Sequence, residues 1–167
     1  MTDVLLTIAE VGSDAPRDHR PAVREAAQAA YHALFDVGAD DPVPGVDRGF
    51  RHLVAARAAR LEGDGAAAEF YLEDAAVTDA ASFVLEGPDG TAGVRAPRRT
   101  RAALRFVELL TSRAAAATAD DLNGLIQAGW TPAEIVVIGQ IVGFVSYQVR
   151  VGQGLRVLDD IFEEAGR

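Results

Sequence analysis

The 167-residue sequence contains no cysteine and no lysine. Thiol peroxidation, disulfide exchange, cysteine-bound zinc and iron–sulfur clusters all require a thiolate, so these activities are excluded for this chain alone. Without lysine, Schiff-base catalysis and a P-loop lysine are excluded as well. All sixteen basic residues are therefore arginine.

An excess of positive charge is also absent, because the formal net charge is −9 and the pI is about 4.7. Binding to a nucleic acid backbone needs clustered positive charge, so we expect no nucleic acid partner. The first residues are acidic and not strongly apolar, which is untypical of a targeting segment and predicts a cytoplasmic protein. The most apolar stretch, Ile135 to Tyr147, is too short to cross a bilayer and predicts a core helix, with no membrane partner.

Sustained alternation of polar and apolar residues, the pattern of strands, is missing, and the sequence predicts an all-α fold. Start signals are an N-cap Asp47, an N-cap Thr118 and a capping box from Thr131 to Glu134 with Pro132 in the first turn. Helices are expected over 2–10, 19–36, 49–62, 66–76, 98–116, 118–129, 132–151 and 155–166. Gly152 and Gly154 are expected to break the last pair, Gly12 to end the first helix, and 84–97 to form an exposed loop.

Two prolines and two glycines between Val37 and Val46 rule out regular structure there. We place a boundary in this segment. Residues 1–46 are predicted to be an N-terminal helical extension and residues 47–167 the main helical domain, the two forming one compact unit.

Two stretches of the chain, Phe50 to Tyr71 and Arg101 to Leu158, carry a family resemblance. The first contains RHLVAARAARLEGDGAAAEFY and the second contains LNGLIQAGWTPAEIVVIGQIVGF. They resemble the AhpD-like, carboxymuconolactone decarboxylase superfamily, in which a glutamate-bearing helix leads into Cys-x-x-Cys-x-x-x-His. The resemblance implies an AhpD-like helical bundle that has lost its catalytic motif.

In that pattern the glutamate falls on His52, the two cysteines on Asp64 and Ala67, and the histidine on Tyr71. We call these four positions the relay positions. Active members use the carboxylate and the histidine to activate a thiol, which Asp64 and Ala67 cannot supply. Thiol-dependent alkylhydroperoxidase activity is therefore predicted to be absent.

The relay positions have two interpretations. In the first, His52, Asp64 and Tyr71 form a new catalytic site, with His52 and Asp64 as an acid/base pair and Glu62 nearby to contact substrate. In the second, Asp64 caps a helix, Tyr71 fills space, and His52 faces solvent or a satisfied partner. The first predicts a decarboxylase-like enzyme for a small carboxylate or lactone; the second predicts a binding or structural protein.

An arginine cluster from Arg95 to Arg105 includes Arg98 and Arg99, which could bind a carboxylate or phosphate ligand or else lie on a solvated face. His19, His32 and His52 are too scattered to predict a metal site, and no cofactor is expected.

The nearly uniform apolar character of Ile135 to Val149 predicts a homo-oligomer, because a small monomer rarely buries such a helix completely. The resemblance implies a trimer, a hexamer or a dimer. The leading hypothesis is a non-redox subunit or small-molecule binding protein, with a cysteine-bearing paralogue as a candidate partner. Whether the chain is an enzyme is left open by the residues.

Overall fold

The computed structural model describes residues 3–11, 21–38 and 40–165. These residues form eight α-helices and no strand, which confirms the all-α prediction. The helices are α1 (Val4–Ala9), α2 (Pro21–Phe35), α3 (Arg48–Leu61), α4 (Gly65–Leu72), α5 (Ala80–Glu86), α6 (Arg98–Arg113), α7 (Ala119–Gln127) and α8 (Pro132–Ala165). Two short 3₁₀ turns, Gly93–Arg95 and Ala114–Ala116, flank α6. Gly12, predicted to end the first helix, and His19 lie outside the described residues.

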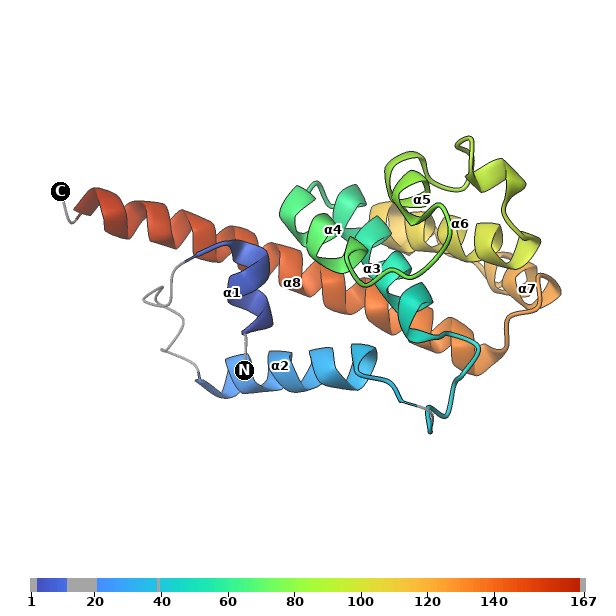
Figure 1. Cartoon of the computed structure of the whole chain (residues 1–167), viewed down its shortest axis with the longest axis horizontal. Helices are drawn as coiled ribbons and strands as arrows, with labels where there is room; N and C mark the ends of the chain where they lie inside the picture. Colours follow the sequence, from blue (N-terminus) through green and yellow to red (C-terminus); the bar gives the residue numbers. More distant parts are fainter. Residues whose placement is uncertain (1–2, 12–20, 39, 166–167) are drawn as a thin grey trace.

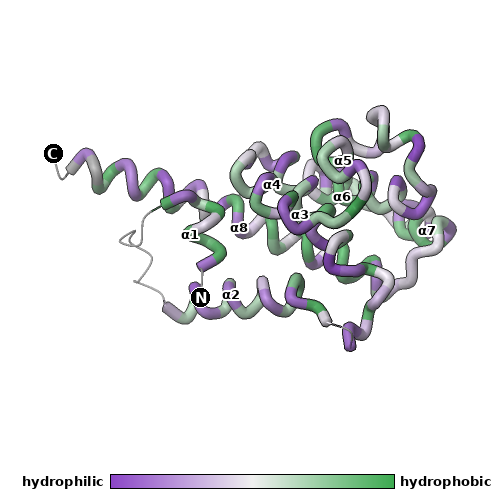
Figure 2. Tube along the Cα trace, viewed as in Figure 1, coloured by the Kyte–Doolittle hydropathy of each residue, from purple (hydrophilic) through white to green (hydrophobic). Residues whose placement is uncertain are grey.

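The long helix α8 runs the length of the molecule, and the other helices gather around it (Figure 1). Helices α3 and α6 pack on its N-terminal half, and α1 lies against its C-terminal half. The end of α8 projects beyond α1 into solvent (Figure 1). Alternating apolar and polar bands continue along this projecting end (Figure 2).

Helix starts that have local sequence signals form as predicted. The Asp47 carboxylate accepts a hydrogen bond from the Phe50 amide at the start of α3. Thr118 and Asp121 form a capping box at the start of α7. At the start of α8, the Thr131 amide donates to Glu134 Oε2 at 2.7 Å. Such contacts satisfy amide groups that the first helical turn leaves without partners.

Helix α3 is the centre of the fold, and every residue from Arg51 to Ala59 is buried. Alanine at four of these positions keeps the helix narrow, so that α4, α5, α6 and α8 all pack against it. Each of the two arginines on this stretch pairs with a carboxylate. Arg51 pairs with Asp41 at 2.6 Å and Arg57 pairs with Glu108. Buried charges are tolerated when they are paired and hydrogen-bonded in this way.

The predicted break at Gly152 and Gly154 is wrong, because α8 continues through both glycines. A glycine inside a helix costs about 1 kcal/mol relative to alanine, which packing can outweigh. Gly152 is buried where α1 crosses α8, and a Cβ there would lie 3.7 Å from the Cβ of Ala9. That distance is an ordinary van der Waals contact, so the packing of α1 on α8 stabilises the helix at this glycine without requiring the side chain to be absent.

The predicted exposed loop over 84–97 is also wrong in part. Helix α5 extends through its first three residues, and Gly87, Pro88, Ala92 and Gly93 are buried. The reason is a long-range contact: Arg57 of α3 donates to the carbonyl oxygen of Val84 at 2.7 Å. The packing of the 87–93 segment therefore depends on an arginine about thirty residues earlier in the chain.

One helix, spanning Pro132–Phe162 within α8, is long and apolar enough by length and composition to cross a membrane. Half of its most apolar window is buried against the rest of this chain. That burial is the behaviour of a core helix in a soluble protein. The prediction of a core helix from Ile135 onward agrees with this arrangement, although the helix is much longer than the apolar stretch.

Candidate functional site

Asp64 lies at the start of α4, where its carboxylate accepts a hydrogen bond from the Ala67 amide at 3.0 Å. The residue is 5% exposed. Its second interaction is an ion pair with Arg156 of α8, at 2.8 Å to Oδ2 and 3.3 Å to Oδ1. Both carboxylate oxygens are therefore occupied by contacts within the chain.

Arg156 also fastens α1 to α8. Its guanidinium donates to the carbonyl oxygens of Ile8 at 2.8 Å and Ala9 at 3.0 Å, which lie at the C-terminal end of α1. These carbonyls have no partner further along the helix, and a cation favours the negative end of the helix dipole. A single arginine thus joins α1, the start of α4 and α8.

Tyr71 lies two turns further along α4 and is fully buried. Its ring packs on Phe35, with centroids 5.1 Å apart, and its hydroxyl donates to Gln148 Oε1 of α8. Burial raises the pKa of Tyr71 well above its usual value, and Tyr31 raises it further, against a smaller opposing effect of the Gln148 hydrogen bond. The phenol is therefore protonated at neutral pH and serves as a hydrogen-bond donor.

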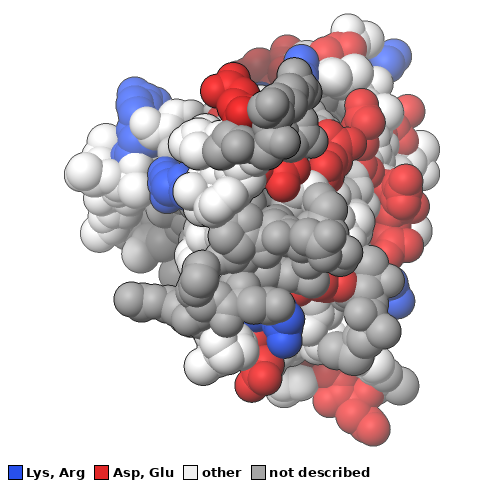
Figure 3. Space-filling view, turned by 90° about the vertical axis from the view of Figure 1, so that its left-hand side faces the viewer, with Lys and Arg blue, Asp and Glu red and all other residues white. Residues whose placement is uncertain are grey.

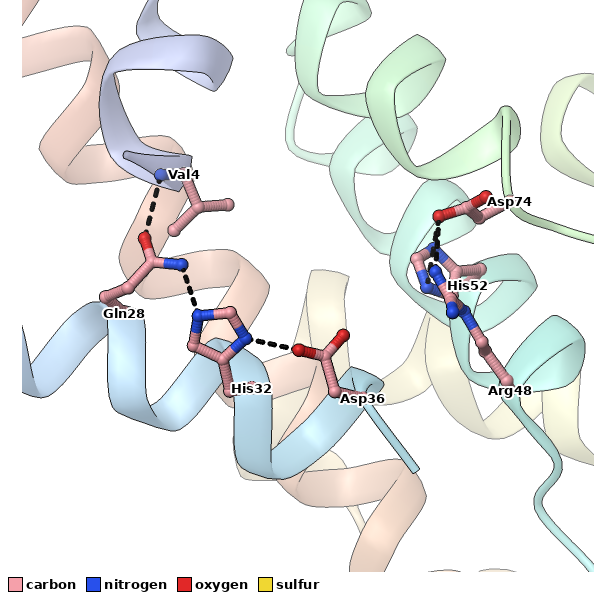
Figure 4. Close-up of polar contacts among 7 residues, drawn as sticks. All are labelled: Val4, Gln28, His32, Asp36, Arg48, His52 and Asp74. Carbon is pink, nitrogen blue, oxygen red and sulfur yellow. Dashed lines mark hydrogen bonds and ion pairs between the residues drawn. The ribbon is translucent and has the colours of Figure 1, made fainter. Parts of the chain in front are cut away.

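His52 of α3 is 1% exposed and lies between the rings of Phe35, at 5.0 Å, and Tyr71, at 6.0 Å. Neither ring nitrogen has a hydrogen-bond partner among the described residues. The nearest carboxylate is Asp74, whose Oδ2 is 3.9 Å from Nε2 and accepts a hydrogen bond from Arg48 at 2.9 Å (Figure 4). Burial lowers the pKa of His52, and Asp74 opposes this shift only in part.

The structure therefore brings His52 and Tyr71 together but not His52 and Asp64. Asp64 and Tyr71 are seven residues apart on α4, which is about 10 Å along the helix axis. His52 makes no hydrogen bond to Asp64, and the carboxylate that faces it belongs to Asp74. The relay positions lie in packed contacts between helices, and none of them lines the grooves described between α6 and α7 or beside α2.

The predicted substrate-contacting residues also have partners within the chain. Glu62, at the end of α3, accepts a hydrogen bond from Ser146 at 2.6 Å. Arg99 pairs with Glu134 at 2.5 Å, and its guanidinium lies 3.9 Å from the centroid of the Trp130 ring. Arg98 is exposed in the first turn of α6.

Three residues that complete these contacts were not singled out from the sequence: Gln148, Arg156 and Asp74. Gln148 carries a usable signal, because a polar residue in an apolar helix usually needs a buried partner. Arg156 and Asp64 are 92 residues apart, and nothing local in either segment indicates their pairing.

A groove with a volume of about 700 Å³ lies between α6 and α7, away from the relay positions. Apolar residues such as Phe106 and Leu109 line it together with Arg105 and Arg113. Arg105 is paired with Asp89 at 2.6 Å. No group of three or more histidine, aspartate or glutamate residues that could hold a metal occurs among the described residues.

No protein-family model matches the sequence, and no curated protein matches it significantly. In structure, the chain is similar to an alkylhydroperoxidase AhpD core, an uncharacterized peroxidase-related protein from Ralstonia eutropha JMP134. The TM-score is 0.60 at 23% sequence identity, over 83% of this chain and 72% of that one. The chain has the AhpD-like fold. The resemblance found in the sequence is thus confirmed for the fold.

None of the four relay positions assigned by the sequence resemblance carries a cysteine. The contacts described for Asp64 and Tyr71 are made within the chain, between helices. Asp64 caps α4 and pairs with Arg156, and Tyr71 bonds Gln148. These contacts join α4 to α8 and stabilise the bundle.

Proposed function

We propose that this chain is a non-redox subunit with the AhpD-like fold, which works by associating through its helices with a second copy of itself or with a cysteine-bearing paralogue. The observation that carries the proposal is that side chains at the relay positions are held by contacts within the chain. Asp64 and Tyr71 are buried and bonded to side chains of α8. A buried group held in this way is not available to a peroxide or a small carboxylate.

Uncovered apolar side chains on α8 support the part of the proposal that concerns association. Val157, Ile161 and Phe162 are each more than half exposed. Large apolar patches on soluble proteins usually mark interaction sites. The proposal includes a cytoplasmic location.

The alternative function, a decarboxylase-like enzyme, requires His52 and Asp64 to act on one substrate. The two residues face different partners, and both imidazole nitrogens lack a hydrogen bond to a carboxylate. Nothing in this geometry favours the enzyme over the subunit.

The association can be tested by size-exclusion chromatography with light scattering on the purified chain over a range of concentrations. We expect a mass of twice the 17.6 kDa chain or a higher multiple. A mass of one chain at every concentration would contradict self-association. In that case the proposal would depend on a paralogue, which co-purification from the native host would have to reveal.

A further inference from the structure

An apolar stripe runs along the side of α8 that the other described helices leave partly or wholly uncovered. We call it the α8 seam, and its members are Phe144, Tyr147, Val151, Gly154, Leu158 and Ile161. Tyr147 is 36% exposed, Leu158 41% and Ile161 54%. The second half of the seam lies on the projecting end of the helix (Figure 1).

The seam residues recur at alternating steps of three and four, which is the spacing at which two helices pack side by side. At 100° per residue they lie within an arc of about 100° on one face of the helix. At 1.5 Å per residue the seam is about 26 Å long. Its members are also symmetric about the point between Gly152 and Gln153, since the steps read the same in both directions.

This symmetry matches an antiparallel pairing with a second copy. When two such helices run in opposite directions about that midpoint, Phe144 lies opposite Ile161, Tyr147 opposite Leu158, and Val151 opposite Gly154. If Gly154 carried a Cβ, no other atom would lie within 4 Å of it, apart from its chain neighbours and the backbone of its own helix. A second copy's Val151 would fill this space.

An apolar groove beside the first half of the seam fits the same pairing. It has a volume of about 360 Å³ and lies between α2 and α8. Val23, Ala26 and Ala30 line one side, and Phe144 and Tyr147 line the other. The antiparallel register brings the exposed Leu158 and Ile161 of a second copy to this groove, where small alanine side chains leave room for them.

Charge favours the same occupant. The seam itself is uncharged, and Arg150, which lies beside it on α8, is 3.5 Å from Glu62. Helical geometry places Asp159 and Asp160 at least 60° from the seam, so the acidic groups of two copies need not meet. Other parts of the surface carry much of the net charge of −9, and acidic side chains line one side of the end view in Figure 3.

A membrane surface fits less well, because helices that lie on membranes usually carry lysine and arginine on their polar face. The polar face at this end of α8 carries Asp159, Asp160 and Glu164 and a single arginine, Arg156, which is already paired with Asp64. The same acidic residues argue against a nucleic acid.

We propose that two copies of this chain pair through their α8 seams, antiparallel and about a two-fold axis beside Gly152 and Gln153. The pairing is isologous, so the same residues contribute from both copies. This inference rests on the proposed function, because it specifies the surface through which the subunit associates.

The first test compares Leu158→Glu with Leu122→Glu by size-exclusion chromatography with light scattering. Leu122, on α7, is 43% exposed and lies outside the seam, which makes it a matched control. Leu158→Glu is expected to weaken association at least tenfold, and Leu122→Glu to leave it unchanged. Circular dichroism verifies that both variants stay helical.

A second test uses the absence of cysteine, because any disulfide must come from an introduced residue. Tyr147→Cys and Leu158→Cys are prepared separately and then oxidised alone and as a mixture. Antiparallel pairing predicts efficient cross-linking in the mixture and little in either variant alone. Parallel pairing would cross-link each variant alone and would overturn the proposal.

The remaining outcomes separate this inference from the proposed function. A wild-type chain that is a monomer at every concentration contradicts self-association, and the seam inference fails with it. A wild-type oligomer that Leu158→Glu leaves intact overturns the seam alone. A trimer also overturns it, because two-fold pairing cannot produce an odd number of subunits.

Discussion

A carboxylate in the first turn of a helix stabilises that turn whether or not it takes part in chemistry. Asp64 is such a carboxylate, and it also pairs with Arg156. In the enzyme interpretation, its replacement would mainly remove activity. In the structural interpretation, the main loss is stability, because a buried arginine contact and a helix cap disappear together.

Asp64→Ala is therefore expected to lower the free energy of unfolding by about 1 to 3 kcal/mol, from the lost cap and the broken ion pair. Urea unfolding followed by circular dichroism measures the change. Asp160→Ala, on an exposed part of α8, is the control and is expected to change stability by less than about 0.5 kcal/mol. Equal stabilities for the Asp64→Ala variant and the wild type would contradict the structural role.

His52 provides a pH-dependent test. Burial lowers its folded-state pKa below the usual 6.5, so the unfolded chain binds this proton more readily than the folded chain. The His52 contribution to stability is therefore unchanged above about pH 7 and becomes unfavourable as pH falls through 6.5, until the folded-state pKa is reached.

His52→Leu, which is similar in volume and apolar, is expected to flatten this part of the stability profile between about pH 7 and pH 5. At pH 7.5 it should be neutral or stabilising, because it removes two unpartnered polar atoms from the core. The measurement is urea unfolding at several pH values, and an unaltered slope in His52→Leu would count against the account.

At the scale of elements, the sequence predicts most helices because their ends have local signals. Asp47, Thr118 and Pro132 mark starts that the structure reproduces within a residue or two. Helix α5 and the unbroken course of α8 were missed because tertiary contacts determine them. Arg57 holds the end of α5, and the close approach of α1 offsets the cost of Gly152.

The candidate site, like the helices, was predictable from the sequence only where the signal is local. The absence of cysteine is read directly from the sequence, and the expectation that Asp64 caps α4 is confirmed. It does not indicate that Arg156 pairs with Asp64 or that Asp74 is the carboxylate nearest to His52. These pairings depend on how helices cross, which spacing within one segment does not encode.

Arg57 should determine how firmly α5 is attached. Arg57→Met keeps most of the side-chain length but removes the hydrogen bond to Val84 and the pair with Glu108. Hydrogen exchange measured by mass spectrometry is expected to show roughly tenfold faster exchange over residues 80–86, from the loss of about 1 to 2 kcal/mol of local stability. Exchange in α4 should stay close to the wild type, and uniform acceleration across the chain would instead indicate global destabilisation.

At the scale of the whole molecule, the chain keeps the AhpD-like fold although it has no cysteine. At the relay positions, an ion pair and a hydrogen bond connect α4 to α8. In the proposed function, the α8 seam is the surface through which this bundle associates as a subunit.

The most direct test of the central claim, that this AhpD-like chain is non-redox, is peroxide consumption by the purified, metal-free protein with a dithiol reductant and an organic hydroperoxide. A thiol peroxidase serves as the positive control. The account predicts a rate equal to that of buffer with reductant alone. Peroxide turnover that increases in proportion to the concentration of this protein would contradict it.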